Sequence, residues 1–264
     1  MYPRRIVCLT EETCETLYLL GEEQRIVGIS GFTVRPPRAR LEKPRVCAFL
    51  SAKFERIVAL EPDLVLGFSD LQADIAAQLI RLGIEVHVFN QRSVAGILGF
   101  IRTLGGMIGV QGKAQALADQ LQANIEAVRV AGLQLPRRPR VYFEEWDSPQ
   151  ISAIRWVSEL IGIAGGEDCF AELGFMPLGR DRIIGDAAEV PRRSPDLIFG
   201  SWCGKKFQPA SVAARTGWAA VPAVRDGELH EIKSALILQP GPAALTDGVA
   251  ALHRHIGNWA ARRA

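Results

Sequence analysis

Short apolar runs alternate along the chain with stretches in which apolar residues recur at helical spacing. Residues 63–68 read DLVLGF, and residues 196–202 read DLIFGSW. Runs this apolar are typical of parallel strands that are buried on both faces of a sheet. The stretches that follow such runs end at Gly or Pro, as helices do. The alternation predicts an α/β fold with parallel sheets and helices on their faces.

One helix is longer than the others and lies near the middle of the chain. Residues 113–130 read KAQALADQLQANIEAVRV, contain no Gly or Pro, and are rich in the helix formers Ala, Leu, Gln and Glu. The apolar side chains that repeat along one face of this helix are Leu117, Leu121, Ile125 and Val128. At about 1.5 Å per residue, the stretch is on the order of 27 Å long.

Similar sequences flank this helix, with PDLVLG at residues 62–67 before it and PDLIFG at residues 195–200 after it. The repetition predicts two Rossmann-like α/β lobes, residues 1–110 and 134–264, joined by a backbone helix over residues 111–133. The carboxyl ends of parallel strands are where α/β folds bind ligands, so we expect the strand ends of both lobes to meet in one ligand cleft.

The other elements follow from the same patterns. The strands expected in the first lobe are 5–10, 26–30, 63–68 and 85–90, and its helices are 11–20, 54–60, 71–82 and 93–110, with a loop over 31–45. The strands expected in the second lobe are 140–146, 196–202 and 228–233, and its helices are 154–163, 187–193 broken by Pro191, 218–224 and 242–261. The last helix carries one apolar face: Leu245, Val249, Leu252, Ile256 and Trp259.

Composition narrows the class of protein. An apolar share of 48% and a charged share of 23% are ordinary for a soluble globular protein, and a net charge of +2 gives no overall attraction to nucleic acid. No apolar run reaches the 18 or so residues of a membrane helix. We expect a monomer that is not inserted in a membrane.

The compartment is predicted from the cysteines and the first residues. Five cysteines, an odd number without a CxxC pair, indicate reduced thiols. MYPRRIVCLT passes at once into a strand and leaves no room for a signal core. The sequence as it stands therefore predicts a cytoplasmic protein. If Met1 instead follows a removed signal, the expected compartment is the periplasm.

One basic segment lies within the predicted loop. Four arginines, Arg35, Arg38, Arg40 and Arg45, are scattered over it. Such a cluster is either a local anion site or a solvated loop surface.

Several longer stretches carry a family resemblance: LTEETCETLYLLG, FERIVALEPDLVLG, GIEVHVFN, VSELIGIAGGEDCF and RRSPDLIFGSW. Together they resemble the helical-backbone class, or class III, of ABC-transporter substrate-binding proteins, over about residues 4–260. Members of that class carry cobalamin, haem and ferric siderophores, and the wording here is closest to the vitamin B12 binders. The resemblance implies a two-lobe clamp with a ligand in the cleft, a possible ABC permease as partner, and no required cofactor.

The resemblance also implies which residues contact the ligand. Phe49 and Phe68 match places where the cobalamin binders have cleft aromatics, and the matching place after the second buried strand holds Ser201, Trp202 and Lys205. Further candidates at strand ends or in loops are Glu11, Phe32, Asn90 and Trp146. Aromatic rings suit a planar or hydrophobic ligand. The alternative is that an aromatic residue at a strand end fills the core. Trp218 and Trp259 are interpreted as core residues, and Trp156 is either a further ligand candidate or a core residue.

Reactive groups are few. In SWCGKK, Cys203 lies beside Lys205 and Lys206, which lower the pKa of a thiol, and the alternative is a small residue in a tight turn. His230 and Cys203 are the candidate metal ligands. His87 is expected in the core, and His253 and His255 on the surface. The sequence has no Ser/His/Asp set, P-loop or GxGxxG, so we expect a binding protein and no enzyme. The alternative is a cytoplasmic corrinoid- or metabolite-handling enzyme, or a ligand sensor, with Cys203 as its reactive group.

One departure from the resembled class concerns the transporter. Members of the class dock on it with one acidic residue on each lobe. The matching places hold Ala73 and Ala188, with Asp74 and Glu189 one step away. A shift of one residue turns a helical side chain by about 100°. Either Asp74 and Glu189 substitute for the docking residues, or the fold and cleft are retained while transport has been lost.

Overall fold

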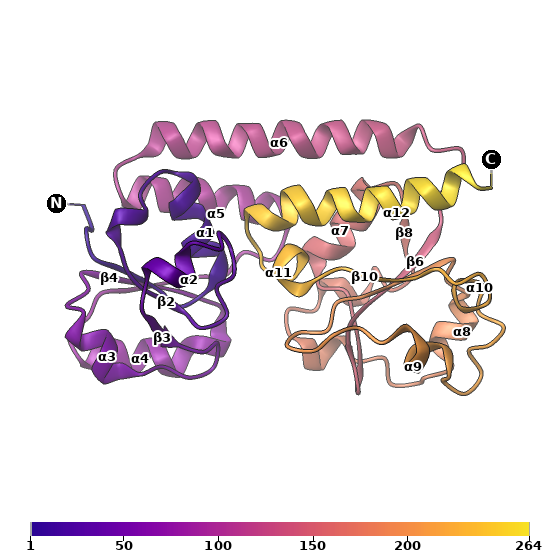
Figure 1. Ribbon diagram of the computed structural model, residues 1–264, viewed down its shortest axis with the longest axis horizontal. Helices are drawn as coiled ribbons and strands as arrows, with labels where there is room; N and C mark the ends of the chain where they lie inside the picture. Colours follow the sequence, from indigo (N-terminus) through magenta and orange to yellow (C-terminus); the bar gives the residue numbers. More distant parts are fainter. Residues whose placement is uncertain (1, 264) are drawn as a thin grey trace. The chain divides into compact units, whose positions relative to one another are not determined.

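The computed structural model describes residues 2–263 and divides into two compact α/β units (Figure 1). Unit 1 comprises Met1–Gln91 and Ala95–Leu121, and unit 2 comprises Arg92–Val94 and Gln122–Ala264. The predicted long helix is α6, Gln111–Leu133, and the chain passes from unit 1 to unit 2 within it.

Unit 1 contains a parallel sheet with the strand order β3-β2-β1-β4-β5. The strands are β1 Ile6–Cys8, β2 Ile26–Ser30, β3 Arg45–Cys47, β4 Leu64–Phe68 and β5 Val86–Phe89. The helices are α1 Glu11–Leu19, α2 Ala39–Glu42, α3 Phe54–Ala59, α4 Ala73–Arg81 and α5 Val94–Met107. In Figure 1, α3 and α4 cover one face of the sheet, and α1 and α5 cover the other. All five residues of β4 are buried, as its apolar sequence predicted.

The prediction of a loop over residues 31–45 was wrong at its end. The segment contains the short helix α2 and leads into β3, which pairs with β2 at the edge of the sheet. The backbone N–H of Ile29 donates to the Pro44 carbonyl at 2.9 Å, and that of Gly31 donates to the Cys47 carbonyl at 2.7 Å. A three-residue strand that begins at Arg45, directly after Pro44, has no periodicity to detect, so only the pairing with β2 defines it.

Unit 2 contains a second sheet, with the strand order β10-β9-β6-β7 and with β8 beside the start of β6. The strands are β6 Arg140–Asp147, β7 Gln150–Ser152, β8 Glu167–Asp168, β9 Leu197–Gly200 and β10 Leu229–Glu231. The helices are α7 Arg155–Ile163, α8 Glu189–Arg193, α9 Pro209–Ala213, α10 Pro222–Arg225, α11 Ser234–Ile237 and α12 Val249–Ala261. Single turns at Glu23–Arg25, Asp70–Gln72, Leu173–Phe175, Gly179–Arg182 and Ala244–Gly248 complete the description.

Several predictions for unit 2 need correction. The hairpin strand β7, the helices α9 and α11, and the short strand β8 were not predicted. Pro191 does not break α8, because it lies in the first helical turn, where a backbone N–H has no intrahelical partner to lose. The apolar face predicted for the closing helix is confirmed: Leu245, Val249, Leu252, Ile256 and Trp259 are all buried.

The repeated Pro-Asp-Leu sequence has the same local structure in both units. Asp63 accepts hydrogen bonds from the backbone N–H groups of Arg4 and Arg5 at 2.7 and 2.9 Å, at the entrance to β1. Asp196 accepts one from the backbone N–H of Arg140 at 2.8 Å, at the start of β6. The residues that precede the two prolines, Glu61 and Ser194, both have positive φ, 45° and 46°. Each motif therefore ties the entrance of one strand to the entrance of its neighbour.

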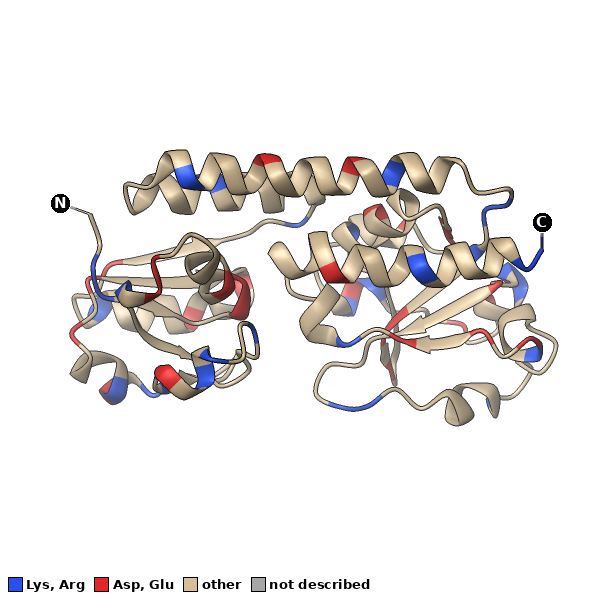
Figure 2. Cartoon of the chain, turned by 45° about the horizontal axis from the view of Figure 1, so that its top comes forward, with Lys and Arg blue, Asp and Glu red and all other residues tan. Residues whose placement is uncertain are grey.

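Charges of both signs are spread over the helices and loops of each unit (Figure 2). No helix in the described part of the chain is both long enough and apolar enough to cross a bilayer. All five cysteines are thiols, and Cys8, Cys14 and Cys47 are buried. Burial raises the pKa of Cys14 to about 12 and that of Cys47 to about 11.

Candidate functional site

In unit 1, the candidate residues follow the carboxyl ends of the parallel strands. Phe68 is the last residue of β4, and the others come within three residues after a strand: Glu11, Phe32, Phe49 and Asn90. Because the strands are parallel, these positions share one edge of the sheet. Phe32, 53% exposed, and Asn90 are accessible and Phe49 is half-buried, whereas Phe68 and Glu11 are buried.

The buried side chain of Gln72 fixes two of these positions. Its Nε2 donates to the Phe49 carbonyl at 2.8 Å, and its Oε1 accepts from the backbone N–H of Phe68 at 2.9 Å. A Cβ on Gly67 would lie 2.9 Å from the same Oε1, so the glycine of the PDLVLG sequence leaves room for this amide. Sequence reasoning missed Gln72, and the glycine four residues after Asp63 was the only signal for it.

Three carboxylates gather in the first turns of α1. Glu15 pairs with Arg35 at 2.7 Å, and Glu11 accepts from the backbone N–H of Val34 at 3.4 Å. Glu12 accepts from the Thr10 hydroxyl at 2.6 Å, and its Oε2 is buried without a hydrogen-bond partner among the described residues. Burial raises the pKa of Glu11 and of Glu12 to about 7. Desolvation therefore outweighs the helix N-terminus, which favours a carboxylate.

The raised pKa values predict that unit 1 loses stability as the pH rises. Each of the two carboxyls holds its proton more tightly in the folded chain, with a pKa of about 7 against an ordinary 4.5. Between pH 4.5 and about 7, the folded chain therefore binds more protons than the unfolded chain does. The contribution of these two groups to the free energy of unfolding is greatest below pH 4.5 and is lost as the pH rises through about 7. Glu12→Gln should stabilise the chain by roughly 2 kcal/mol at pH 8 and flatten this pH dependence.

Urea unfolding from pH 5 to pH 8 measures this effect. The matched control is Glu55→Gln on the exposed side of α3, which should change neither the stability nor its pH dependence. Equal curves for the two variants would contradict the prediction.

In unit 2, β6 and β9 are parallel and end at the same edge. Lys205, which follows β9, places its Nζ 4.3 Å from the Trp146 ring centroid and 4.9 Å from that of Trp202. The same Nζ donates to Asp147 Oδ1 at 2.6 Å. The structure thus brings together three of the predicted residues, and of these Lys205 is exposed and Trp146 half-buried.

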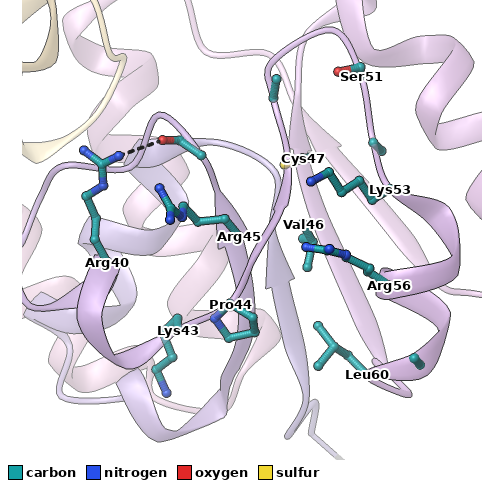
Figure 3. A pocket seen from close by; sticks show the side chains of 14 residues that line it. Arg40, Lys43, Pro44, Arg45, Val46, Cys47, Ser51, Lys53, Arg56 and Leu60 are labelled. Atoms are coloured by element: carbon teal, nitrogen blue, oxygen red, sulfur yellow. Dashed lines mark hydrogen bonds between the residues drawn. The ribbon is translucent and has the colours of Figure 1, made fainter.

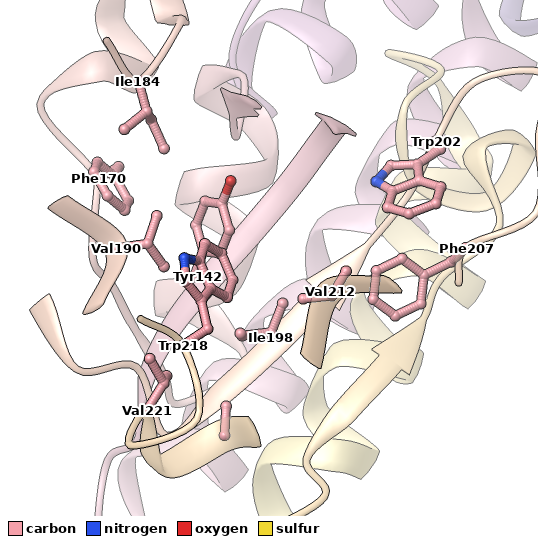
Figure 4. Close-up of a cluster of buried hydrophobic side chains, with 11 residues drawn as sticks. Tyr142, Phe170, Ile184, Val190, Ile198, Trp202, Phe207, Val212, Trp218 and Val221 are labelled. Atoms are coloured by element: carbon pink, nitrogen blue, oxygen red, sulfur yellow. The ribbon is translucent and has the colours of Figure 1, made fainter. Parts of the chain in front are cut away.

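Trp202 lies inside the core of unit 2, at 4% exposure (Figure 4). Its ring packs edge-on against Phe207 at 5.0 Å, and its Nε1 donates to Glu144 Oε1 at 3.0 Å. Ser201 is also buried, and its backbone N–H donates to the Glu144 carbonyl at 2.9 Å. A ligand contact through Trp202 or Ser201 stays a prediction, and the observed contacts are those of core residues.

Sequence reasoning missed the charged pair below this edge. The fully buried carboxylate of Glu144 receives both terminal guanidinium nitrogens of Arg215, at 2.5 and 2.9 Å. Arg215 also lines an open pocket of about 470 Å³ with Asp147, Pro149 and Trp218. The sequence EEW at residues 144–146 does not predict that Glu144 is buried, because the next residue, Glu145, is equally polar. The ion-pair partner, Arg215, is 71 residues away in the sequence.

The reactive groups proposed from the sequence are separated. Cys203 is exposed in the turn after β9, and the next residue, Gly204, has a φ of +80°. His230 lies on β10, its Nε2 3.0 Å from Glu228 Oε2. Among residues 2–263, no three His, Cys, Asp or Glu side chains gather as metal ligands.

The other histidines differ from the expectations. His255 is not a simple surface residue: it is half-buried and stacks on His230 with a centroid distance of 4.2 Å, and burial lowers its pKa to about 4. His253 is half-buried and lies 3.0 Å from the Ala164 carbonyl. His87 is half-buried against Phe89, so it is not a fully buried core residue. The core positions predicted for Trp218 and Trp259 are confirmed, and burial of Trp156 favours the core alternative for it.

The two acidic residues near the docking places differ in their surroundings. Asp74 is exposed in the first turn of α4, and it forms no ion pair among the described residues. Glu189 pairs with Arg193 at 2.8 Å and Arg192 at 2.6 Å, and these hydrogen bonds hold the pKa of its carboxyl below the ordinary value.

Parallel sheets flanked by helices in two units, with one long helix between them in the sequence, define the class of helical-backbone binding proteins. The chain belongs to the periplasmic binding protein family, which it matches over residues 6–236. The resemblance read from the sequence is therefore confirmed.

Relatives agree with this assignment. The chain is 22% identical to the uncharacterized ABC transporter substrate-binding lipoprotein YvrC of Bacillus subtilis, over 96% of this chain and 80% of the relative. It is 24% identical to the vitamin B12-binding protein of Vibrio parahaemolyticus, over 91% of this chain and 85% of that protein.

Two solved structures share the fold. The periplasmic heme-binding protein RhuT from Roseiflexus sp. RS-1, in its apo form, superposes with a TM-score of 0.80 at 24% identity, covering 96% of this chain and 99% of that one. The periplasmic vitamin B12-binding protein BtuF of Vibrio cholerae superposes with a TM-score of 0.76 at 22% identity, covering 97% and 98%.

Proposed function

We propose that this protein binds a large metal-containing small molecule, of the cobalamin, haem or ferric siderophore type, as the substrate-binding component of an ABC importer. The family membership over residues 6–236 is the observation that carries the proposal. The relatives are named for vitamin B12 and heme binding, and the pattern of strand-end aromatics is consistent with a broad, flat ligand.

The proposed ligand contacts are the accessible groups at the carboxyl edges of the two sheets. They are Phe32, Phe49 and Asn90 in unit 1, and Trp146 and Lys205 in unit 2. The other predicted contacts are buried, so in this proposal they pack beneath the accessible groups and hold them in position: Glu11, Phe68, Ser201 and Trp202. The Lys205 ammonium pairs with Asp147 and lies over the Trp146 ring, so in this proposal it holds that ring in place at the edge of the sheet. The predicted cleft between lobes stays a prediction.

The proposed partner is an ABC transporter, through the exposed carboxylate of Asp74. Glu189 is already paired with two arginines and contributes less to docking in this proposal. The family is by description periplasmic and one relative is by name a lipoprotein, which favours the periplasm, the second of the two compartments considered.

A ligand screen tests the binding function. Purified chain is mixed with cobalamin, cobinamide, haem and a panel of ferric siderophores, and its melting temperature and the ligand absorbance are followed. A ligand at about 100 times its Kd should stabilise the fold by roughly 2.7 kcal/mol, a shift of a few degrees. Phe32→Ala should weaken this binding by about tenfold, because it removes a ring that contacts the ligand. The ring is exposed, so its removal should not destabilise the fold.

Phe175→Ala is the matched control, since Phe175 is a 69% exposed ring in unit 2 that follows no strand end. It should bind as the unchanged chain does, and Cys203→Ala should as well. No binding across the panel would reject the proposed function. Equal losses from Phe32→Ala and Phe175→Ala would reject the proposed contact.

A further inference from the structure

Unit 1 contains a pocket of about 820 Å³ beside the edge strand β3 (Figure 3). One side of the pocket is formed by α2 and the segment that follows it, and the other by α3 and the residues that flank it. Between them lies β3 with the turn after it. This volume lies in the usual range for small-molecule sites, about 300–1,000 Å³.

The charges that line this pocket all have one sign. Its basic residues are Arg40, Lys43, Arg45, Lys53 and Arg56, and its lining includes no Asp or Glu. Glu42 is the last residue of α2 and lies next to Lys43 in the sequence, but its carboxylate interacts with residues outside the pocket. It accepts a hydrogen bond from the Tyr18 hydroxyl at 2.7 Å and lies 3.6 Å from Arg38. Because the net charge of the whole chain is only +2, this concentration of positive charge is a local feature of the pocket.

The five cations make no direct ion pair with an acidic side chain among residues 2–263, although Arg40 is near enough to Glu11 to lower the pKa of that carboxyl. Arg40 donates to the Gly31 carbonyl at 3.5 Å, and among the described residues none of the five forms an ion pair with a carboxylate. Their neighbours in the same basic segment behave differently, because Arg35 pairs with Glu15 and Arg38 pairs with Glu23, each at 2.7 Å. The segment is therefore divided: two arginines are neutralised, and the other two line the pocket.

The frame that carries these side chains is held by backbone hydrogen bonds. The backbone N–H of Lys53 donates to the Val46 carbonyl at 2.8 Å, and that of Ala48 donates to the Ser51 carbonyl at 2.8 Å. In Figure 3, Lys53 and Arg56 extend from one wall toward β3, and Arg45 extends from the opposite side. These hydrogen bonds fix the backbone positions that carry the cations before any ligand arrives, which lowers the entropy cost of binding.

We propose that this pocket binds a small organic polyanion, a compound with two or more phosphate or carboxylate groups on an apolar body. Arginine forks match both kinds of group with paired hydrogen bonds, and a pocket lined by one sign of charge concentrates its counter-ion. Val46, Ala52 and Leu60 supply apolar surface for the body of the compound. The site lies within unit 1, and its lining includes none of the ligand contacts proposed above.

Titration calorimetry with sodium tripolyphosphate and with citrate tests the site on the full chain. We expect one binding site per chain for at least one of these anions, with an affinity that falls as salt is added. Arg45→Gln with Arg56→Gln should weaken this binding at least tenfold. Lys53→Gln with Arg56→Gln leaves β3 untouched and should act in the same direction, which guards against misfolding of the first pair.

The matched control is Arg81→Gln with Arg137→Gln, which removes the same charge from exposed positions outside the pocket. It should leave the affinity unchanged. An equal loss from the control pair, or several weak sites per chain, would overturn the proposal. So would binding to RNA or to vesicles with anionic lipid, combined with no binding of either small anion. A response to tripolyphosphate alone assigns the site to phosphates, and a response to citrate alone assigns it to polycarboxylates.

Discussion

Replacing Glu144 by Ala is expected to destabilise the protein by about 3 kcal/mol, the cost of removing one partner from a buried ion pair. The Glu144 carboxylate is fully buried and receives the guanidinium of Arg215, the Tyr142 hydroxyl at 3.0 Å and the Trp202 indole at 3.0 Å. Without it, a mostly buried cation and two buried donors lose their acceptor. Urea unfolding followed by tryptophan fluorescence measures the change.

Glu126→Ala is the matched control for this prediction. Glu126 pairs with Arg129 at 3.2 Å on an exposed face of α6, and such pairs are worth about 0.5 kcal/mol or less. Similar losses from the two variants would mean that the Glu144 cluster is no stronger than a surface pair. The double variant Glu144→Leu with Arg215→Met removes both charges and should recover part of the loss, since a buried pair can be exchanged for apolar contacts.

Gly200→Ala should also cost the protein about 3 kcal/mol, at the upper end of what overpacking a core costs. A Cβ on Gly200 would lie 1.8 Å from Cδ2 and 2.1 Å from Cε2 of Phe207, so the ring must leave its position. Phe207 is buried against Trp202, and its backbone N–H is held by Glu231 Oε1 at 3.0 Å. The expected result is a lower melting temperature with an altered Trp202 fluorescence.

Gly162→Ala provides the control for the same chemical change. A Cβ at Gly162 in α7 meets no atom within 4 Å, so this variant should gain about 0.5–1 kcal/mol from helix propensity. Adding Phe207→Ala to Gly200→Ala removes the clash, so the double variant should be more stable than the sum of the single losses predicts. If the losses of stability from Gly200→Ala and Phe207→Ala simply add in the double variant, a clash with the Phe207 ring is not the reason that Gly200 is needed.

The sequence by itself determined the elements whose signal is local. The apolar runs defined β4 and β9, and the Ala-rich stretch defined α6. All five residues predicted for the apolar face of the closing helix are buried, four in α12 and Leu245 in the turn before it. The Pro-Asp-Leu repeat identified two similar halves, and the structure gives the reason: in each half the aspartate binds the backbone at the entrance to the neighbouring strand. Periodicity and short motifs suffice where a residue's environment depends on its near neighbours.

Only the tertiary structure decided the features that depend on distant partners. The strand β3 exists because it pairs with β2, and Glu144 is buried because Arg215, far along the chain, neutralises it. Trp202, predicted as a ligand contact, is buried in the core of unit 2 against Phe207, and the sequence around it does not show that contact. The basic pocket has the same origin, because Arg45 and Arg56 belong to different elements that the sheet edge brings together. Burial and net local charge are sums over contacts between remote segments, so no local pattern in the sequence contains them.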